Sequence, residues 1–310
     1  MSELHTSLLA LATWDTAART PMTDEDAAAA SVLRELVVEH YRSDGKEAAP
    51  FPLLAMELIG TGARRDWDVA PLAALIGKDP VIAARVIRAA NSAYSAGVRE
   101  VETLRDAVVR LGTRAAAGVA VTAATRALFD GEARAIQRTF RSSWERLWQH
   151  AVRTAAGARW LARQLGQGDP ERAFLGGLLH DVGKTFALRS LAALVVEEQI
   201  RASVEERIAW ELVDAAHVEV GTELAVFWNF PEYLTSVCMM HHAGAASPLP
   251  EVELVRLVSA VDDVVFDPWH RAGLDADLEQ ACAALGVQPE TVIELAGTLG
   301  ELGAQASAGL

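Results

Sequence analysis

Apolar residues recur at intervals of three and four along most of this chain, in stretches separated by short polar or glycine-containing breaks. This spacing is typical of helices that bury one face. No stretch alternates apolar and polar residues as a half-buried strand does, and no segment repeats at a fixed period. The pattern predicts an all-α protein, with helices within 2–41 and over about 53–59, 71–76, 80–90, 104–111, 113–129, 141–165, 171–184, 191–200, 204–229, 231–242, 251–266, 275–285 and 289–302.

Local signals mark several helix starts and one close contact. Asp68 and Asp79 precede apolar helical stretches, where an aspartate can cap the first amides, and Pro80 suits a first helical turn. Gly176 and Gly177 lie inside a predicted helix, where each costs about 1 kcal/mol relative to alanine. Their presence indicates that another helix packs closely there.

Polar breaks divide the chain into three predicted parts. Residues 1–45 form a helical extension without candidate chemistry, which either packs on the main body or forms a mobile arm. Residues 46–130 form a first helical bundle, which opens at Pro50-Phe51-Pro52 and closes at the polar hinge Asp130-Gly131-Glu132. Residues 131–310 form a second helical domain that includes the C-terminal helices.

Composition narrows the classes of partner. The chain is 51% hydrophobic but only 6% aromatic, so its core consists mainly of Ala, Leu and Val, which favours packed helices. A net charge of -14 argues against nucleic acid and against an anionic membrane surface as partners. A small phosphorylated ligand in a locally basic or metal-bearing pocket remains compatible with this charge.

The location is predicted to be the cytoplasm. Two cysteines, Cys238 and Cys282, are too few for a disulfide framework and indicate a reducing compartment. No apolar run reaches membrane-spanning length, and the N-terminus lacks the basic region of a signal peptide.

The stretch from Leu178 to Lys184 carries the most distinctive chemistry. His180 and Asp181 are adjacent behind an apolar run and can reach one ion from two sides, while Lys184 lies one turn further on, where its ammonium can meet a phosphate. A buried His-Asp pair is costly unless it is paired, hydrogen-bonded or metal-bound. Taken alone, this dipeptide is more simply interpreted as a satisfied polar pair at a helix start.

Other histidines change that interpretation. Five of the eight histidines fall on predicted helices of the second half, together with Asp181 and the pair Asp262-Asp263 inside an apolar run: His150, His180, His217, His241 and His242. Imidazoles and carboxylates gathered in this way are typical of a metal site. The mixture suits Fe, Mn, Zn or Ni better than Mg or Ca, and the sequence does not select among the four.

The order of these residues resembles the HD phosphohydrolase superfamily, and most closely its HDOD subfamily, bacterial signalling domains related to the HD-GYP phosphodiesterases. The first half supports the resemblance independently through Ile76–Pro80, Arg85–Ala93 and Leu104–Gly112. In the second half it rests on Gly176–Lys184 and His217–Gly221. The resemblance covers about Pro50 to Ala245 and implies an N-terminal helical bundle packed on an HD-type helical bundle.

The resemblance also implies residue roles. His150, His180, Asp181 and one of Asp262 or Asp263 match the basic HD ligand set, with Asp262 preferred and Asp181 able to bridge two metals. His217, His241 and His242 match the additional ligands of the HD-GYP group. The chain is thus expected to bind one to three divalent metals, with Asp181 and Lys184 as catalytic residues if it hydrolyses a phosphate ester.

One departure affects the expected activity. After His241-His242 the chain continues Ala243-Gly244-Ala245-Ala246-Ser247-Pro248, without the acidic residue and Gly-Tyr-Pro loop of an HD-GYP phosphodiesterase. The expected function is therefore a bacterial regulatory module that acts through a protein partner or a small nucleotide ligand. The alternative is a metal-dependent phosphohydrolase acting on a nucleotide or cyclic dinucleotide. In a third interpretation, the metal only staples the helices together.

Overall fold

The computed structural model describes residues 3–14, 23–45, 51–61, 68–92, 100–129, 138–200, 204–267, 269 and 273–307. Within these ranges the chain forms helices and no strand, so the predicted all-α class is confirmed. The predicted hinge at 130–132 lies outside the described residues, and the three domain boundaries stay predictions.

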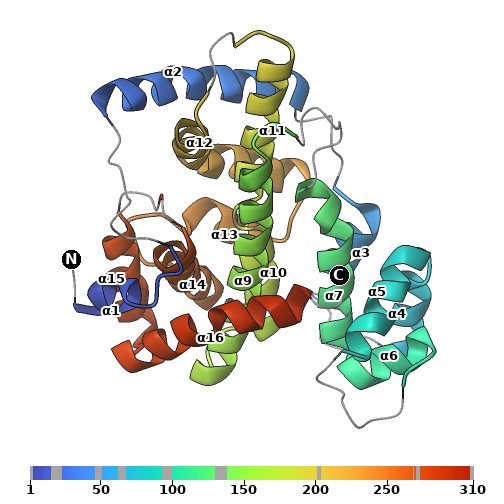
Figure 1. The fold of residues 1–310 in the computed structure, drawn as a ribbon. Coiled ribbons are helices and arrows are strands. Elements are labelled where there is room, and N and C mark those ends of the chain that lie inside the picture. Colours follow the sequence, from blue (N-terminus) through green and yellow to red (C-terminus); the bar gives the residue numbers. More distant parts are fainter. Residues whose placement is uncertain are drawn as a thin grey trace.

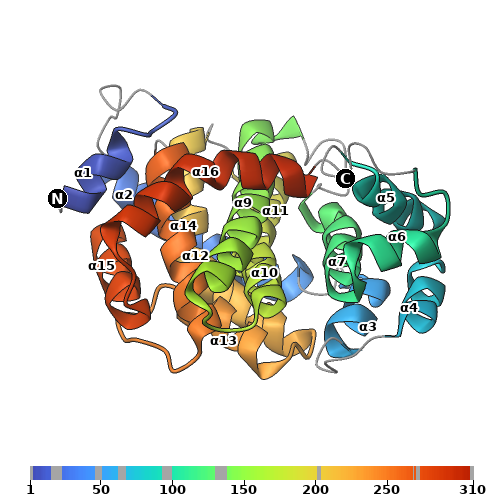
Figure 2. The ribbon, with the colours of Figure 1, turned by 90° about the horizontal axis from the view of Figure 1, so that it is seen from below.

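The first bundle stands on one side of the molecule, at the right of Figures 1 and 2. Asp79 caps α5 as predicted, because its carboxylate accepts the amides of Val81 (2.9 Å) and Ile82 (3.1 Å). Asp68 occupies the capping position of α4, but its side chain makes no capping hydrogen bond, contrary to the prediction. The helices are α3 (Leu53–Thr61), α4 (Val69–Ile76), α5 (Pro80–Ala90), α6 (Leu104–Leu111) and α7 (Thr113–Phe129).

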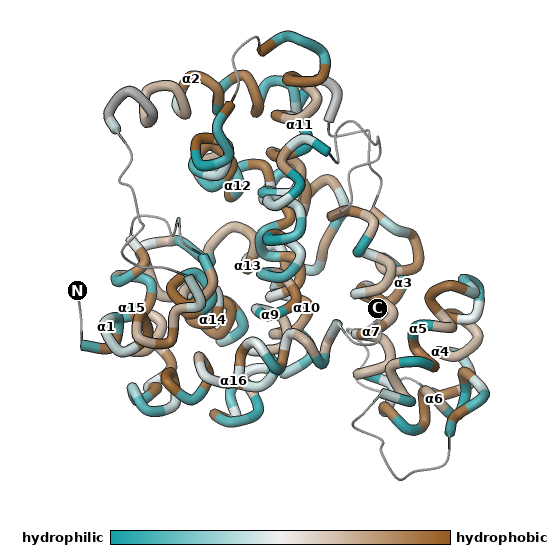
Figure 3. The backbone as a smooth tube through the Cα atoms, in the orientation of Figure 1, coloured by the Kyte–Doolittle hydropathy of each residue, from teal (hydrophilic) through white to brown (hydrophobic). Residues whose placement is uncertain are grey.

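The second bundle is built around the long helix α9 and the buried helix α10. In Figure 3, α10 is hydrophobic along most of its length, whereas α16 on the outside is mostly pale or hydrophilic. The helices are α9 (Arg141–Leu165), α10 (Pro170–Leu179), α11 (Val182–Val196), α12 (Glu206–Phe227), α13 (Glu232–Met240), α14 (Pro250–Phe266), α15 (Leu274–Leu285) and α16 (Pro289–Ser307).

Two glycines allow helices of this bundle to approach closely. A Cβ on Gly177 would lie 2.7 Å from the backbone of Ala155 in α9, which confirms the close packing predicted from the sequence. A Cβ on Gly183 would lie 2.0 Å from the carbonyl oxygen of His217 in α12. The helices that carry the candidate ligands are therefore in backbone contact at these two points.

The stretch from Leu178 to Lys184 is not one continuous helix, contrary to the prediction. Helix α10 ends at Leu179, His180 and Asp181 form a turn, and α11 begins at Val182 rather than near Leu191. Apolar periodicity continues through the turn because both helices are buried, so periodicity alone cannot mark the break. The turn places His180 and Asp181 at the junction of two helices.

The N-terminal extension packs on the second bundle in its described parts. Helix α1 (Glu3–Leu9) contacts α14 and α16, and after it Thr13 and Trp14 donate hydrogen bonds to the carbonyl groups of Val265 and Val264. Helix α2 (Asp24–His40) and the π-helical turn Tyr41–Gly45 cross α11 and α12 (Figure 1). The two alternatives left open by the sequence are thus decided in favour of packing for these residues.

None of the described helices is by itself long and apolar enough to cross a membrane. One pair, α6 with α7, passes that test only when joined, and it is bent by 115°.

Candidate metal centre

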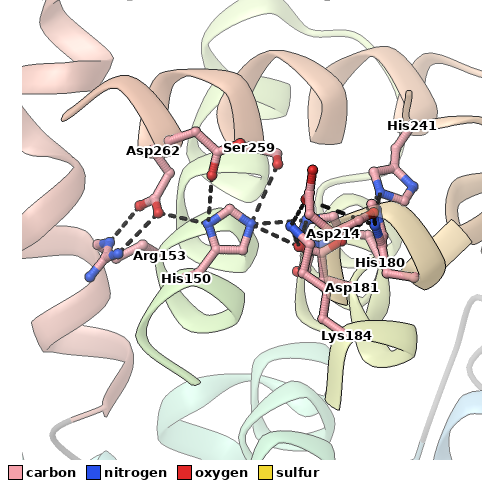
Figure 4. Close-up of polar contacts among 12 residues, drawn as sticks. His150, Arg153, His180, Asp181, Lys184, Asp214, His241, Ser259 and Asp262 are labelled. Carbon is pink, nitrogen blue, oxygen red and sulfur yellow. Dashed lines mark hydrogen bonds and ion pairs between the residues drawn. The ribbon is translucent and has the colours of Figure 1, made fainter. Parts of the chain in front are cut away.

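Candidate ligands from five parts of the second bundle meet at its centre (Figure 4). They come from α9 (His150), the turn between α10 and α11 (His180, Asp181), α12 (His217), the end of α13 (His241, His242) and α14 (Asp262, Asp263). All of these side chains are buried except that of His242, which is half-buried. The tertiary structure therefore gathers every residue that the sequence nominated as a ligand.

The carboxylate of Asp181 lies between two pairs of imidazoles. Its Oδ2 is 3.3 Å from Nε2 of His150 and 3.4 Å from Nε2 of His180, and these two nitrogens are 3.1 Å apart. Its Oδ1 is 3.3 Å from Nε2 of both His217 and His241, which are 3.2 Å from each other. Each carboxylate oxygen thus faces two imidazole nitrogens, as a bridging ligand of two cations would.

The other ring nitrogen of each imidazole is held by an oxygen acceptor. The acceptors of the four Nδ1 atoms are Asp262 for His150 (2.7 Å), the Gly177 carbonyl for His180 (2.8 Å), the Asp214 carbonyl for His217, and the Val237 carbonyl for His241 (2.9 Å). An Nδ1–H that donates to oxygen leaves the Nε2 of the neutral ring with a lone pair. Four Nε2 atoms and a carboxylate therefore converge on one buried place, an arrangement that binds metal cations when each ring is neutral.

The pKa values of the imidazoles are shifted in opposite directions, even between His150 and His180, which face the same oxygen of Asp181. Burial by itself lowers the pKa of His150, but Asp262 and Asp181 on opposite sides of the ring raise it to about 10. Burial lowers the pKa of His217 to about 4 and that of His180 well below its usual value. Burial alone would raise the pKa of Asp181, yet His180 and Lys184 hold it well below its usual range, so the carboxylate is ionised. The centre thus offers neutral rings at His180 and His217 and an anionic oxygen donor, whereas His150 has to release a proton before its Nε2 can bind a cation.

The donor set fits divalent metal ions. Both oxygens of Asp181 are buried; Oδ2 is paired with the Lys184 ammonium at 2.8 Å, whereas Oδ1 faces only the Nε2 atoms of His217 and His241. Three groups of donor atoms lie within 4.8 Å of one another: Asp181 with His217, His241 and His242; His150 with His180 and Asp181; and His150 with Asp262 and Asp263. A buried anionic oxygen without hydrogen bonds is costly unless a cation occupies its other side.

Asp262 occupies a different place from the other candidate ligands. Its Oδ2 contacts Nδ1 of His150, and its Oδ1 pairs with the guanidinium of Arg153 at 2.5 Å. Figure 4 shows Asp262 between Arg153 and His150, on the side of the ring away from Asp181. Asp263 approaches the same Nδ1 at 3.6 Å. Direct metal ligation by Asp262 or Asp263 stays a prediction, while the contacts present here orient His150.

His242 is also oriented by a carboxylate. Its Nδ1 lies 3.2 Å from Asp277 of α15, and its ring stacks at 4.0 Å between centroids on that of His241. Asp277 is buried although α15 is an outer helix. The sequence offered no signal for this contact except an acid in the first turn of a helix, which is common.

Lys184 contacts the Asp181 carboxylate that the imidazoles also face. Its ammonium is 2.8 Å from Oδ2 of Asp181 and 3.0 Å from Asp214 of α12, and the two acids raise its pKa despite its burial. Its predicted catalytic role stays a prediction, and in this structure it neutralises Asp181. The sequence analysis did not identify Asp214, although a carboxylate three residues before a helical histidine in an apolar stretch was a usable signal.

A buried arginine fixes the segment that carries His241 and His242. The guanidinium of Arg256 donates to the carbonyl groups of Met240 (2.6 Å) and His241 (3.1 Å) and pairs with Glu253 at 2.7 Å. The same Glu253 accepts the amide of Ser247 at 2.6 Å. The ion pair between Arg256 and Glu253 of α14 therefore fixes both the end of α13 and the short loop that follows His242.

Comparison with known proteins identifies related sequences. The HDOD domain family profile matches residues 48–244. An uncharacterized protein of Treponema pallidum (strain Nichols) is 26% identical over 199 residues, which are 63% of this chain and 37% of that protein. Ribonuclease Y of Pseudothermotoga lettingae is 29% identical over 123 residues, which are 39% of this chain and 19% of that enzyme. This chain thus matches well under half the length of either curated relative.

Solved structures share the fold. An HDOD domain protein of unknown function from Geobacter sulfurreducens has a TM-score of 0.66 and 25% identity, over 90% of this chain and 98% of that one. A protein of Shewanella amazonensis SB2B, provisionally described as a metal-dependent phosphohydrolase, has a TM-score of 0.63 and 18% identity, over 88% and 99%. A provisionally described signal transduction protein of Marinobacter aquaeolei VT8 has a TM-score of 0.62 and 22% identity, over 95% and 67%.

Proposed function

Because this chain belongs to the HDOD domain family, we propose that it is a bacterial regulatory module whose second bundle holds two divalent metals and recognises a phosphorylated ligand there. The observation that carries the proposal is the position of Asp181, with one oxygen facing His150 and His180 and the other facing His217 and His241. A bridging carboxylate between two imidazole pairs has little other use in a buried core.

Each candidate residue has its own role in this proposal. His150 and His180, which face Oδ2 of Asp181, would hold one metal, and His217, His241 and His242 would hold the other. Lys184 keeps Asp181 ionised and adds positive charge beside the site. When bound, the two metals would supply Lewis acidity and would lower the pKa of a water between them.

The second candidate function is phosphohydrolysis at the same centre. The donors grouped around both oxygens of one carboxylate favour it, because a structural metal is typically a single site closed by four protein ligands and needs no bridging oxygen. The loop after His242 favours the regulatory function instead. It carries no acidic side chain from Ala243 to Pro248, and Arg256 holds it through the carbonyl group of Ala245. No additional carboxylate from this loop therefore reaches the site.

Metal analysis of protein purified without added metal, and after reconstitution with Fe, Mn, Zn or Ni, tests the proposal. We expect close to two metals per chain, and His40→Ala, which removes an imidazole outside the cluster, should keep both. Less than one metal per chain after reconstitution with each of the four would contradict the proposal.

An activity screen of the metal-loaded protein separates regulation from hydrolysis. The substrates are a generic aryl phosphodiester and cyclic dinucleotides. We expect bound metal without turnover; turnover that His180→Ala abolishes in a folded protein would establish the phosphohydrolase. Metal without turnover and without ligand binding, but with melting on chelation, would establish the structural staple.

A further inference from the structure

An arginine held between two tryptophans lies beside the metal centre and is not among its ligands. The guanidinium carbon of Arg146 is 3.9 Å from the ring centroid of Trp269 and 4.5 Å from that of Trp210. The three residues come from α9, the segment after α14, and α12. Such a sandwich restricts the rotation of the guanidinium, because a planar cation stacks favourably on aromatic faces.

Arg146 lies on the helix that carries His150. It lies four residues before His150, so the two side chains share one face of α9 at about 5–6 Å between their Cβ atoms. Trp210 links Arg146 to Lys184 of the metal centre. Its ring centroid lies 4.5 Å from the guanidinium carbon of Arg146 and 5.9 Å from the ammonium nitrogen of Lys184. Asp267 acts electrostatically on Arg146, Lys184 and His150 alike.

Exposure rises from the metal centre towards Arg146. The side chains of Asp181 and Lys184 are each 4% exposed, that of Asp214 is 17% exposed, and that of Arg146 is 25% exposed. These residues are linked by successive contacts: Asp181 to Lys184, Lys184 to Asp214 and to Trp210, and Trp210 to Arg146. Arg146 is therefore the most solvent-accessible residue of this series of contacts.

The hydrogen-bonding capacity of Arg146 is largely unused. Its Nε is buried and has no hydrogen-bond partner among the described residues, and its Nη2 makes only a 3.4 Å contact with the hydroxyl of Ser143. Glu206 lies 3.7 Å away, but its Oε1 already accepts the hydroxyl groups of Ser142 and Ser143. Burial lowers the pKa of Arg146, although Asp267 and Glu206 act to raise it. An arginine in this condition can bind an additional anion.

We propose that Arg146, stacked between Trp210 and Trp269, binds a second anionic group of the phosphorylated ligand whose first phosphate lies at the metal centre. The inference rests on the proposed function, because it assumes that metals bind the first phosphate. The ligand class is a diphosphate, or a compound with two phosphodiester groups, in which one anionic group reaches the metals and the other reaches Arg146. A guanidinium fork suits such a group because it donates two parallel N–H bonds to phosphate oxygens.

Two probes of different length test this proposal in the full-length, metal-loaded protein. Calorimetric titration compares inorganic orthophosphate, which reaches only the metals, with inorganic pyrophosphate, which reaches the metals and Arg146. In the wild type we expect pyrophosphate to bind at least about tenfold more tightly. Arg146→Gln should remove this preference and leave the orthophosphate affinity and the metal content unchanged.

Matched variants identify the cause of any loss. Arg141→Gln removes an exposed arginine from the start of the same helix and should keep the preference. Trp269→Leu keeps the charge but removes one stacking face, so it should weaken pyrophosphate binding by less than Arg146→Gln does. A lower melting temperature of Arg146→Gln with an unchanged pyrophosphate preference would show that the stack is structural and would overturn the inference.

The failures of the two proposals are distinguishable. If the wild type binds no metal, the proposed function fails and the inference fails with it. If the wild type binds two metals but neither probe, or binds pyrophosphate equally well with and without Arg146, only the role of Arg146 is overturned and the metal centre stands.

Discussion

The two sides of the Asp181 carboxylate are built from similar ligands but supported differently. On the Oδ2 side, formed by His150 and His180, the Nδ1 of His150 contacts Asp262, which is itself paired with Arg153. On the Oδ1 side, formed by His217, His241 and His242, backbone carbonyl groups accept from His217 and His241, and Asp277 contacts His242. The carboxylate distinguishes His150 alone: its pKa is raised to about 10, whereas burial lowers the pKa of His217 to about 4 and that of the carbonyl-bound His180 well below its usual value.

This contrast indicates that support, rather than ligand type, sets the strength of each half-site. A carboxylate behind an imidazole raises the basicity of its other nitrogen, whereas a neutral carbonyl only fixes the ring orientation. We therefore expect the Oδ2 side to hold its metal more tightly than the Oδ1 side. Stepwise chelation should remove one metal first, and that metal should be the one on the Oδ1 side.

The largest effect is expected from Asp181→Asn, which removes the charge shared by both sides. Both metals should be lost, because an amide is a poor bridging ligand and the buried ammonium of Lys184 loses its nearest anion. Metal content by mass spectrometry, together with a circular dichroism spectrum that shows an intact helical fold, measures this. Retention of either metal would show that the carboxylate does not bridge.

The next largest effect is expected from single histidine variants, which should each remove the metal on one side of Asp181. His241→Ala should remove the Oδ1-side metal and leave one metal per chain, whereas His180→Ala should remove the Oδ2-side metal, because each ring faces only one oxygen of Asp181. Metal content after dialysis distinguishes the two variants from His40→Ala. If each variant loses both metals, the two sites are coupled and the comparison of independent half-sites is wrong.

Arg256→Met tests whether the loop after His242 is needed for the Oδ1 side. Loss of the guanidinium leaves Glu253 buried without its partner, which costs about 3–5 kcal/mol in similar cases. It also frees the carbonyl groups at the end of α13. Chemical denaturation should show the destabilisation, and the metal content of the folded variant should fall only on the Oδ1 side. The combined variant Glu253→Gln with Arg256→Met should regain part of the stability but not the metal.

The smallest effect compares the two carboxylates behind the rings. Asp262→Asn should weaken the Oδ2-side metal about 10- to 100-fold, as for other partners of metal-bound histidines, and Asp277→Asn should weaken the Oδ1-side metal by less. Affinities from competition with a chelator dye measure both. Complete loss of the Oδ2-side metal in Asp262→Asn would instead identify Asp262 as a direct ligand.

Much of the fold could be predicted from the sequence because buried helices keep their apolar period and their caps are local. Asp79, Pro80 and Gly177 each act within a few residues or through one close contact. The break at His180 was not placed correctly, because apolar residues continue on both sides of the His-Asp pair in two helices that are both buried, although the pair itself suggested a helix start. Arg256 was overlooked because a charged residue in an apolar stretch does not reveal its distant partners.

The sequence by itself determined the all-α class, the close packing at Gly177 and the set of imidazoles and acids, since residue type and helical period are local properties. Only the tertiary structure decided which oxygen of Asp181 faces which ring and placed Asp262 behind His150. It also brought Asp214, Asp277 and Arg256 to the ligands. These contacts join residues on different helices, and their geometry depends on how closely the helices pack, which no local pattern encodes.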